Sequence, residues 1–149
     1  MKTKIAFIAA IVASLSFAQA AEIKAPNKGR IIDSVEPRAE FVITQDKKIE
    51  IRFLDDTGKV IAPAAQTASV IMGDRAAPTK ISFTKDGDKL VSDKAVPEGE
   101  KLPVVLQIKT TVDAKAVTEK FNLDTAHCPP CGLAEYACIC DHAKEEKKP

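Results

Sequence analysis

Between residues 41 and 123 the chain alternates short apolar runs with turn residues, a pattern that predicts β-strands. The clearest case is residues 48–53 (KIEIRF), where polar and apolar side chains alternate as in a strand with one buried face. Residues 55–58 (DDTG) and 85–88 (KDGD) carry the Asp and Gly residues typical of tight turns. We interpret the second of these as the turn of a hairpin, because apolar residues flank it on both sides.

The same patterning predicts further strands along the chain. They are expected at residues 29–35, 67–72, 79–84 and 117–123, with one more strand that places Val104, Leu106 and Ile108 on a single face. About seven short strands then follow at intervals of roughly 8–12 residues, without a long helix. This rhythm predicts a mainly β fold, and we expect a single antiparallel β-sandwich of immunoglobulin-like or cupredoxin-like type.

The first twenty residues have the three parts of a signal peptide. Lys2 and Lys4 give a positive start, residues 5–17 are almost wholly apolar, and residues 18–20 (AQA) form a small-x-small cleavage pattern. The apolar run is shorter than the roughly 20 residues that a membrane-spanning helix needs. We therefore expect cleavage after Ala20, a periplasmic or secreted location, and no membrane insertion of the mature protein.

Charge excludes two classes of partner. Cleavage of the signal peptide leaves 129 of the 149 residues, and the loss of its two lysines changes the formal net charge from +1 to −1. A chain of that length supports one modest core. Because acidic and basic residues are mixed throughout, no basic footprint for nucleic acid and no polybasic cluster for a membrane surface is expected.

All four cysteines and both histidines of the chain lie within residues 127–142 (HCPPCGLAEYACICDH). A segment this rich in Pro, Gly and Ala buries too little apolar surface to hold a fixed shape alone. It must be cross-linked by a metal ion or by disulfides. We expect four parts in the chain: a signal peptide (1–20), a β-sandwich domain (21–125), a Cys/His-rich segment (126–142) and a disordered charged tail (143–149).

The spacing of these residues suits a metal ion. Two residues separate the cysteines of the first pair, so both thiolates can bind one ion from a tight turn, which the intervening prolines pre-form. The second pair can fold back and complete a tetrahedral site, while the flanking histidines can replace a thiolate or complete a second site. Soft thiolates suit both Cu(I) and Zn²⁺. The candidate metal ligands are Cys128, Cys131, Cys138, Cys140, His127 and His142.

The alternative is a pair of disulfides, because exported domains with an even number of cysteines usually oxidise them. A Cys138–Cys140 bond would close a strained ring, which favours pairing 128–138 with 131–140 or 128–140 with 131–138. The protein would then be a disulfide-stapled β-sandwich interaction module without a metal. The two flanking histidines favour the metal, since disulfides give no reason for them.

The sequence contains little that indicates an enzyme. A redox-active Cys-x-x-Cys dithiol is a third interpretation, but such motifs follow a strand and open a helix, and no βαβ pattern surrounds residues 128–131. No histidine lies outside the cluster to serve as the base of a nucleophilic mechanism. We therefore expect that the protein is not an enzyme.

Residues 26–63 (PNKGRIIDSVEPRAEFVITQDKKIEIRFLDDTGKVIAP) and 127–142 together resemble a group of small uncharacterised bacterial periplasmic proteins. These look like companions of heavy-metal efflux systems of the resistance-nodulation-division (RND) type. Their opening commonly reads Pro-His/Asn-Gly-Gly-Arg, whereas this chain has Asn27-Lys28-Gly29-Arg30 and no histidine there. The resemblance implies an envelope efflux or metal-transport protein as partner. The expected function is to bind Cu(I) or Zn for sequestration or hand-over in metal homeostasis.

Overall fold

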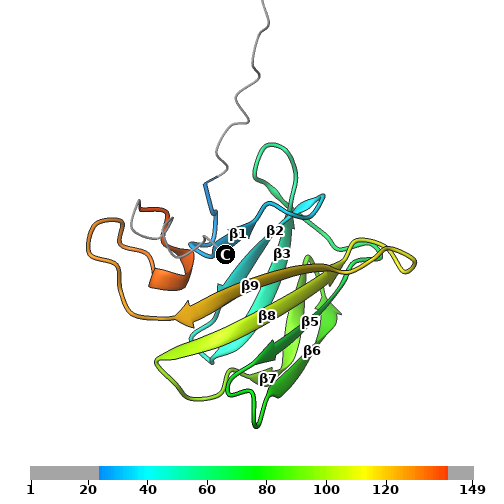
Figure 1. Cartoon of the computed structure of the whole chain (residues 1–149). Helices are drawn as coiled ribbons and strands as arrows, with labels where there is room; N and C mark the ends of the chain where they lie inside the picture. The colour runs from blue at the N-terminus through cyan, green and yellow to red at the C-terminus, as the bar shows by residue number, and fades with distance from the viewer. Residues whose placement is uncertain (1–23, 141–149) are drawn as a thin grey trace, which may run out of the picture.

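The computed structural model describes residues 24–140 of the chain. The described residues form nine strands and one short 3-10 helix, and Figure 1 shows their arrangement. The elements are β1 (Arg30–Ile32), β2 (Arg38–Ile43), β3 (Lys48–Leu54), β4 (Val60–Ile61), β5 (Thr67–Met72), β6 (Thr79–Asp86), β7 (Lys89–Ala95), β8 (Lys101–Lys109), β9 (Val117–Asp124) and η1 (Glu135–Ala137). The expected signal peptide, His142 and the charged tail lie outside the described residues.

Eight of the strands form one continuous antiparallel sheet in the order β1-β2-β3-β7-β6-β5-β8-β9, and β4 pairs with β3 beside it. The sheet curls around a single core into a nearly closed barrel (Figure 1). The prediction of a mainly β, antiparallel fold is therefore confirmed. The prediction of a sandwich, immunoglobulin-like or cupredoxin-like, is wrong, because a sandwich consists of two separate sheets.

Strand β6 joins the two halves of the sheet. Its first half pairs with β5, where Ser82 lies opposite Ser69, and its second half pairs with β7, where Phe83 lies opposite Ser92. The strand thus changes partner at its middle and carries the sheet around the corner. The alternation of polar and apolar residues in the sequence shows which face of a strand is buried. Because the strands of a barrel and of a sandwich both bury one face, this alternation does not distinguish the two folds.

Most strand predictions agree with the structure. The expected strand at residues 67–72 coincides with β5, and the segments 48–53, 79–84 and 117–123 lie within β3, β6 and β9. The hairpin turn is confirmed, since Asp86 pairs with Lys89 across two residues, and Gly87 adopts φ 59°. Strand β2 was not predicted, because its buried Glu40 interrupts the apolar pattern.

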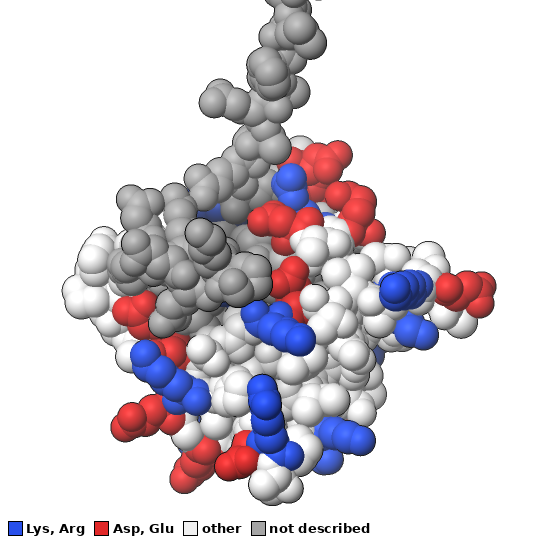
Figure 2. All heavy atoms as spheres, in the orientation of Figure 1, with Lys and Arg blue, Asp and Glu red and all other residues white. Residues whose placement is uncertain are grey.

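The barrel is filled by the inward faces of its strands. Val104, Leu106 and Ile108 of β8 are each 1 % exposed, which confirms their predicted common face. On the opposite wall, Ile51 and Phe53 of β3 are fully buried. The outer surface carries interleaved basic and acidic side chains over the face shown in Figure 2, as the near-neutral composition suggests. Within residues 24–140, no helix is long and apolar enough to span a membrane.

Side chains rather than backbone pairing close the barrel between β1 and β9, a gap that we call the seam. Within residues 24–140 the strand order ends at these two strands without joining them. The Arg30 guanidinium lies 4.6 Å from the ring centroid of Phe121, a cation–π arrangement. The Phe121 ring meets Phe41 edge-on with centroids 5.2 Å apart, and the ring of Tyr136 in η1 also meets Phe41 edge-on, with centroids 6.0 Å apart.

A buried carboxylate anchors the chain that precedes β1. Glu40 is fully buried and accepts hydrogen bonds from the backbone N–H of Asn27 at 2.8 Å, from Nδ2 of Asn27 at 2.8 Å and from the N–H of Gly29 at 2.9 Å. A Cβ at Gly29 would lie 2.4 Å from the carbonyl oxygen of Phe41. Asn27 and Gly29, in the segment that carries the family resemblance, thus have a structural role in this chain.

Candidate metal centre

Residues 126–140, which we call the cysteine segment, begin with a small hairpin. The N–H of Glu135 donates to the carbonyl of Ala126 at 2.9 Å, and the N–H of Cys128 donates to the carbonyl of Leu133 at 2.8 Å. The Gly132 N–H closes the turn onto the carbonyl of Cys128 at 2.9 Å, and its φ of 70° is one that glycine adopts without strain. The two prolines therefore occupy the tip of a tight turn, as predicted.

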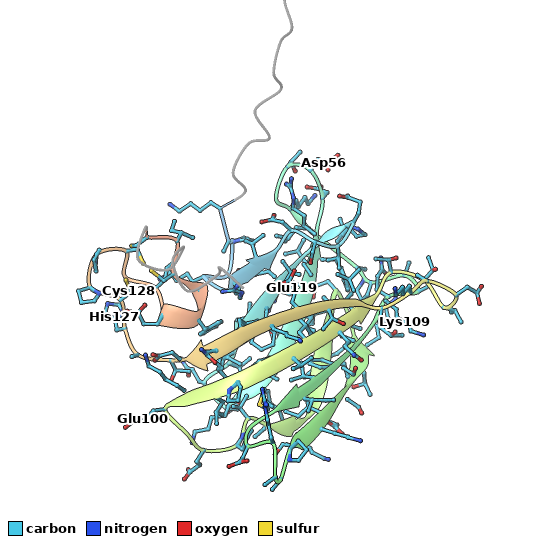
Figure 3. All side chains as sticks on the ribbon, in the orientation of Figure 1. Asp56, Glu100, Lys109, Glu119, His127 and Cys128 are labelled. Carbon is cyan, nitrogen blue, oxygen red and sulfur yellow. The ribbon has the colours of Figure 1, made fainter. Side chains whose placement is uncertain are left out.

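The 3-10 helix η1 then returns the chain to the hairpin. The N–H of Ala137 donates to the carbonyl of Ala134 at 2.9 Å, and the N–H of Cys138 donates to the carbonyl of Glu135 at 3.1 Å. This single turn reverses the chain direction and brings the second cysteine pair beside the first. Figure 3 shows Cys128 in this segment, in the loop that follows β9.

The four cysteines converge on one point. Their Sγ atoms all lie within 4.8 Å of one another. The Sγ of Cys138 is 3.3 Å from that of Cys128 and 3.6 Å from that of Cys131, and the Sγ atoms of Cys128 and Cys140 are 3.9 Å apart. Four sulfurs bound tetrahedrally at about 2.3 Å to a zinc ion would lie about 3.8 Å apart. The cluster therefore has the dimensions of a four-thiolate metal site and can hold a metal ion.

The same distances give no support to the disulfide alternative. None of the four cysteines is in a disulfide, and a disulfide would bring two sulfurs to about 2.05 Å. Cys138 lies close to two other cysteines at once, and so does Cys128. Such sharing is expected when four sulfurs surround one ion, whereas two disulfides would divide them into separate pairs.

Backbone N–H groups point at the sulfurs. The N–H of Cys131 donates to the sulfur of Cys128 and the N–H of Leu133 donates to the sulfur of Cys131. The N–H of Cys140 donates to the sulfur of Cys138 at 3.4 Å. These donors fix the side-chain orientation and stabilise negative charge on the sulfurs, as outer hydrogen bonds do around bound metals.

The cluster has an inner and an outer half. Cys128 and Cys138 are buried, whereas Cys131 and Cys140 are half-buried. Burial raises the pKa of the Cys128 thiol to about 12 and that of Cys140 to about 11. The hydrogen bond from the backbone of Leu133 lowers the pKa of Cys131 to about 7. At neutral pH the outer Cys131 is thus a thiolate in a substantial fraction of molecules and can capture a cation first.

Of the two candidate histidines, only His127 lies within the described residues, and it is not part of this group. His127 is exposed and pairs through its backbone with Ala134 in the hairpin (Figure 3). It is not one of the residues whose ligand atoms lie within 4.8 Å of one another. His142 lies outside the described residues, so its predicted part in the site stays a prediction.

Tyr136, which the sequence analysis did not single out, attaches the cysteine segment to the barrel. Its hydroxyl oxygen accepts a hydrogen bond from the N–H of Ile43 at 3.1 Å, and its carbonyl oxygen accepts one from Nη1 of Arg30 at 3.1 Å. The sequence did contain a signal for this role, since Tyr136 is the only aromatic residue between the two cysteine pairs. A buried tyrosine commonly joins an apolar ring to a hydrogen-bonded hydroxyl.

Comparison of the chain with models of protein families, with curated proteins and with solved structures finds no match. The geometry of the cysteine cluster therefore carries the functional argument.

Proposed function

We propose that this protein is exported and binds one soft transition-metal ion through Cys128, Cys131, Cys138 and Cys140, to sequester the ion or hand it over in metal homeostasis. The convergence of four Sγ atoms within 4.8 Å carries the proposal. Its role is binding and not catalysis. The ion is Zn²⁺ or Cu(I), the two that soft thiolates select.

Of these two ions, the geometry favours Zn²⁺. Cu(I) is satisfied by two or three sulfurs, whereas four sulfurs at the corners of a tetrahedron suit Zn²⁺. The Sγ separations of 3.3, 3.6 and 3.9 Å bracket the tetrahedral value of about 3.8 Å. A closed site of this type binds Zn²⁺ with an apparent free energy of about 10–16 kcal/mol at pH 7.

The difference between the inner and outer halves supports release as well as storage. Cys131 and Cys140 are half-buried, so a competing thiol can approach the ion from their side while the buried pair keeps its hold. His127 is exposed on the hairpin that carries the first cysteine pair and offers an imidazole to an ion in transit. Thiol exchange on the accessible side is the expected route of hand-over to a partner.

Export and partner rest on the sequence. Residues 1–20 have the pattern of a signal peptide, so the ion would be met in the periplasm or outside the cell. The resemblance to companions of RND-type efflux systems supports an envelope efflux or metal-transport protein as the recipient. Mass analysis of the mature protein tests export directly: an intact Met1 in the folded protein would contradict it.

Metal content of the native protein is the decisive measurement. The full chain should be expressed with its own signal, recovered from the periplasm without chelators under anaerobic conditions, and analysed for metals and for thiols in denaturant. One equivalent of zinc and four titratable thiols are expected. Two intact disulfides with no stoichiometric metal would overturn the proposal in favour of a disulfide-stapled interaction module.

The choice of ion needs a separate experiment. Cobalt(II) substituted into the site should show the strong visible absorption of tetrahedral thiolate coordination and should be displaced by one equivalent of Zn²⁺. Competition between Zn²⁺ and Cu(I) chelators of known affinity then ranks the two ions. A Cu(I) complex of more than one ion per chain, with no cobalt spectrum, would assign the site to copper.

A further inference from the structure

Tyr136 and the metal ligand Cys138 belong to one rigid turn. Only one residue separates them, and the turn is fixed by the hydrogen bonds from Ala137 to Ala134 and from Cys138 to Glu135. Glu135 is in turn bonded to Ala126 of the hairpin that carries the first cysteine pair. Any movement of the second cysteine pair is therefore transmitted to the tyrosine ring.

On the other side of that turn, Tyr136 reaches into the barrel at the seam. It is 6 % exposed, its ring packs against Phe41 at 6.0 Å, and its hydroxyl accepts the N–H of Ile43. Its carbonyl accepts Nη1 of Arg30, the residue that stacks on Phe121 across the seam. The helix η1 contacts both β1 and β9. Tyr136 is thus the residue through which the cysteine segment packs against the barrel at the seam.

Apart from its backbone hydrogen bonds, the cysteine segment has few buried side chains to order it. Within residues 126–140 the buried residues are Cys128, Tyr136, Ala137 and Cys138, and two of these four are metal ligands. Ordering the backbone of such a segment costs conformational entropy, and a 3-10 helix of one turn has little stability of its own. Burial of one tyrosine and one alanine offsets only part of that cost.

We infer that metal binding at the four cysteines fixes Tyr136 in the seam, and that loss of the metal releases Tyr136 and opens the seam between β1 and β9. This inference rests on the proposed function. The metal then regulates the shape of the barrel, and a partner can recognise whether the protein is loaded.

The surface that changes is a groove of about 980 Å³ along the seam. Arg30, Phe121, Glu119 and Tyr136 line it, together with the loop that follows β5. Glu119, the third residue of β9, is labelled in Figure 3. With Tyr136 withdrawn, the fully buried ring of Phe41 becomes accessible from this groove, beside Phe121, which already lines it. The loaded and metal-free proteins therefore present different surfaces beside the metal site.

The chain contains its own probe for this change. Tyr136 is the only tyrosine and the chain has no tryptophan, so near-ultraviolet circular dichroism in the tyrosine region and tyrosine fluorescence report on this residue. The full mature chain, loaded with one equivalent of Zn²⁺, is compared with the same protein stripped by EDTA under anaerobic, reducing conditions. Stripping should abolish the tyrosine dichroism and raise the acrylamide quenching constant at least twofold.

Hydrogen exchange gives an independent measure at the barrel. The amide of Ile43, which donates to the Tyr136 hydroxyl, should exchange at least tenfold faster in the stripped protein. Amides of β6 and β7, which lie at the middle of the strand order and farthest from the seam, should keep their protection, and the far-ultraviolet spectrum should stay that of a β protein. Unfolding of the whole barrel on metal removal would contradict a local release.

Coupling between two sites is reciprocal, so Tyr136 must also affect metal affinity. The Tyr136→Ala variant should bind Zn²⁺ about tenfold more weakly, whereas Tyr136→Phe keeps the ring and should lose less than threefold. The matched control is Ile139→Ala, since Ile139 lies between two ligands in the sequence but its side chain is 59 % exposed. Its affinity should match that of the parent protein.

The outcomes separate the two proposals. Stoichiometric Zn²⁺ binding with identical tyrosine signals before and after stripping would overturn the seam inference and leave the proposed function intact. Equal zinc affinity of Tyr136→Ala and the parent protein would do the same. Absence of zinc binding to the parent chain would overturn both.

Discussion

The hydroxyl oxygen of Tyr136 accepts a hydrogen bond from the backbone N–H of Ile43 at 3.1 Å, across 93 positions of the chain. Ile43 is the last residue of β2, so this bond ties the cysteine segment to the wall of the barrel. Tyr136 and Ala137 also join the core cluster of the barrel. The cysteine segment and the barrel therefore share one core, and the stability of each depends on contacts with the other.

Truncation tests how far the barrel depends on the segment. A chain that ends at Thr125 keeps all nine strands but loses Tyr136 and Ala137. We expect it to fold with a β-type spectrum and a free energy of unfolding lower by about 3 kcal/mol, the usual cost of removing one large buried side chain. Urea denaturation measures this loss, and a chain ending at residue 142 is the control. Failure to fold would contradict the domain boundary expected at residue 125.

Removal of one inner ligand should abolish tight metal binding. Cys138 lies within 3.3 and 3.6 Å of two other sulfurs, so Cys138→Ser leaves three thiolates around an open position. We expect zinc affinity to fall by at least a thousandfold, since the lost thiolate belongs to a closed site. His127→Ala should change the affinity less than threefold, because His127 lies outside the group of four sulfurs. Chelator competition measures both, and a large loss for His127→Ala would make it a ligand.

Metal affinity should weaken steeply as the pH falls. Before metal binds, burial holds the pKa of Cys128 at about 12 and that of Cys140 at about 11, so both are protonated at pH 7 and must release protons to bind. These two protons alone should make the affinity fall at least a hundredfold for each unit of pH lost, and more steeply below pH 7, where Cys131 also becomes protonated. Titration with a chelator at pH 6, 7 and 8 measures the slope. A pH-independent affinity would rule out thiolate ligands.

Cys131 should be the first cysteine of the metal-free protein to react with iodoacetamide. The backbone hydrogen bond from Leu133 lowers its pKa to about 7, and its side chain is half-buried, so a thiolate is both present and accessible. The alkylation rate at Cys131 should rise with pH and level off above about pH 8, and bound Zn²⁺ should suppress it. Peptide mass spectrometry identifies the modified residue. Preferential labelling of the buried Cys128 would show that the order of reactivity is different.

Glu40 should be essential to the anchoring of the chain before β1. The variant Glu40→Ala leaves the N–H groups of Asn27 and Gly29 without their acceptor, and we expect a loss of about 3 kcal/mol in unfolding free energy. Glu40→Gln keeps one acceptor oxygen, and rotation of the Asn27 amide can satisfy the other position, so its loss should be about 1 kcal/mol. Equal losses in the two variants would show that shape rather than hydrogen bonding matters at this site.

Part of the candidate site was evident from the sequence, because its ligands are close together in the chain. Two residues separate Cys128 from Cys131, and a turn over such a distance depends on local geometry alone, which the prolines and Gly132 favour. The four-cysteine cluster found in the structure agrees with that prediction. The division into inner and outer thiols was not predictable, because burial depends on where the segment rests on the barrel.

The sequence by itself determined most of the strands, the hairpin turn at Gly87 and the grouping of the cysteines, since each follows from side-chain periodicity or short-range backbone preference. Only the tertiary structure decided that the sheet closes into a barrel. Strand β6 pairs with β5 and then with β7, and the alternation of polar and apolar residues does not show which strands will pair. The tertiary structure also decided that Tyr136 meets Ile43 and Arg30 at the seam. Such contacts arise from the packing of segments far apart in the chain, and no local pattern encodes them.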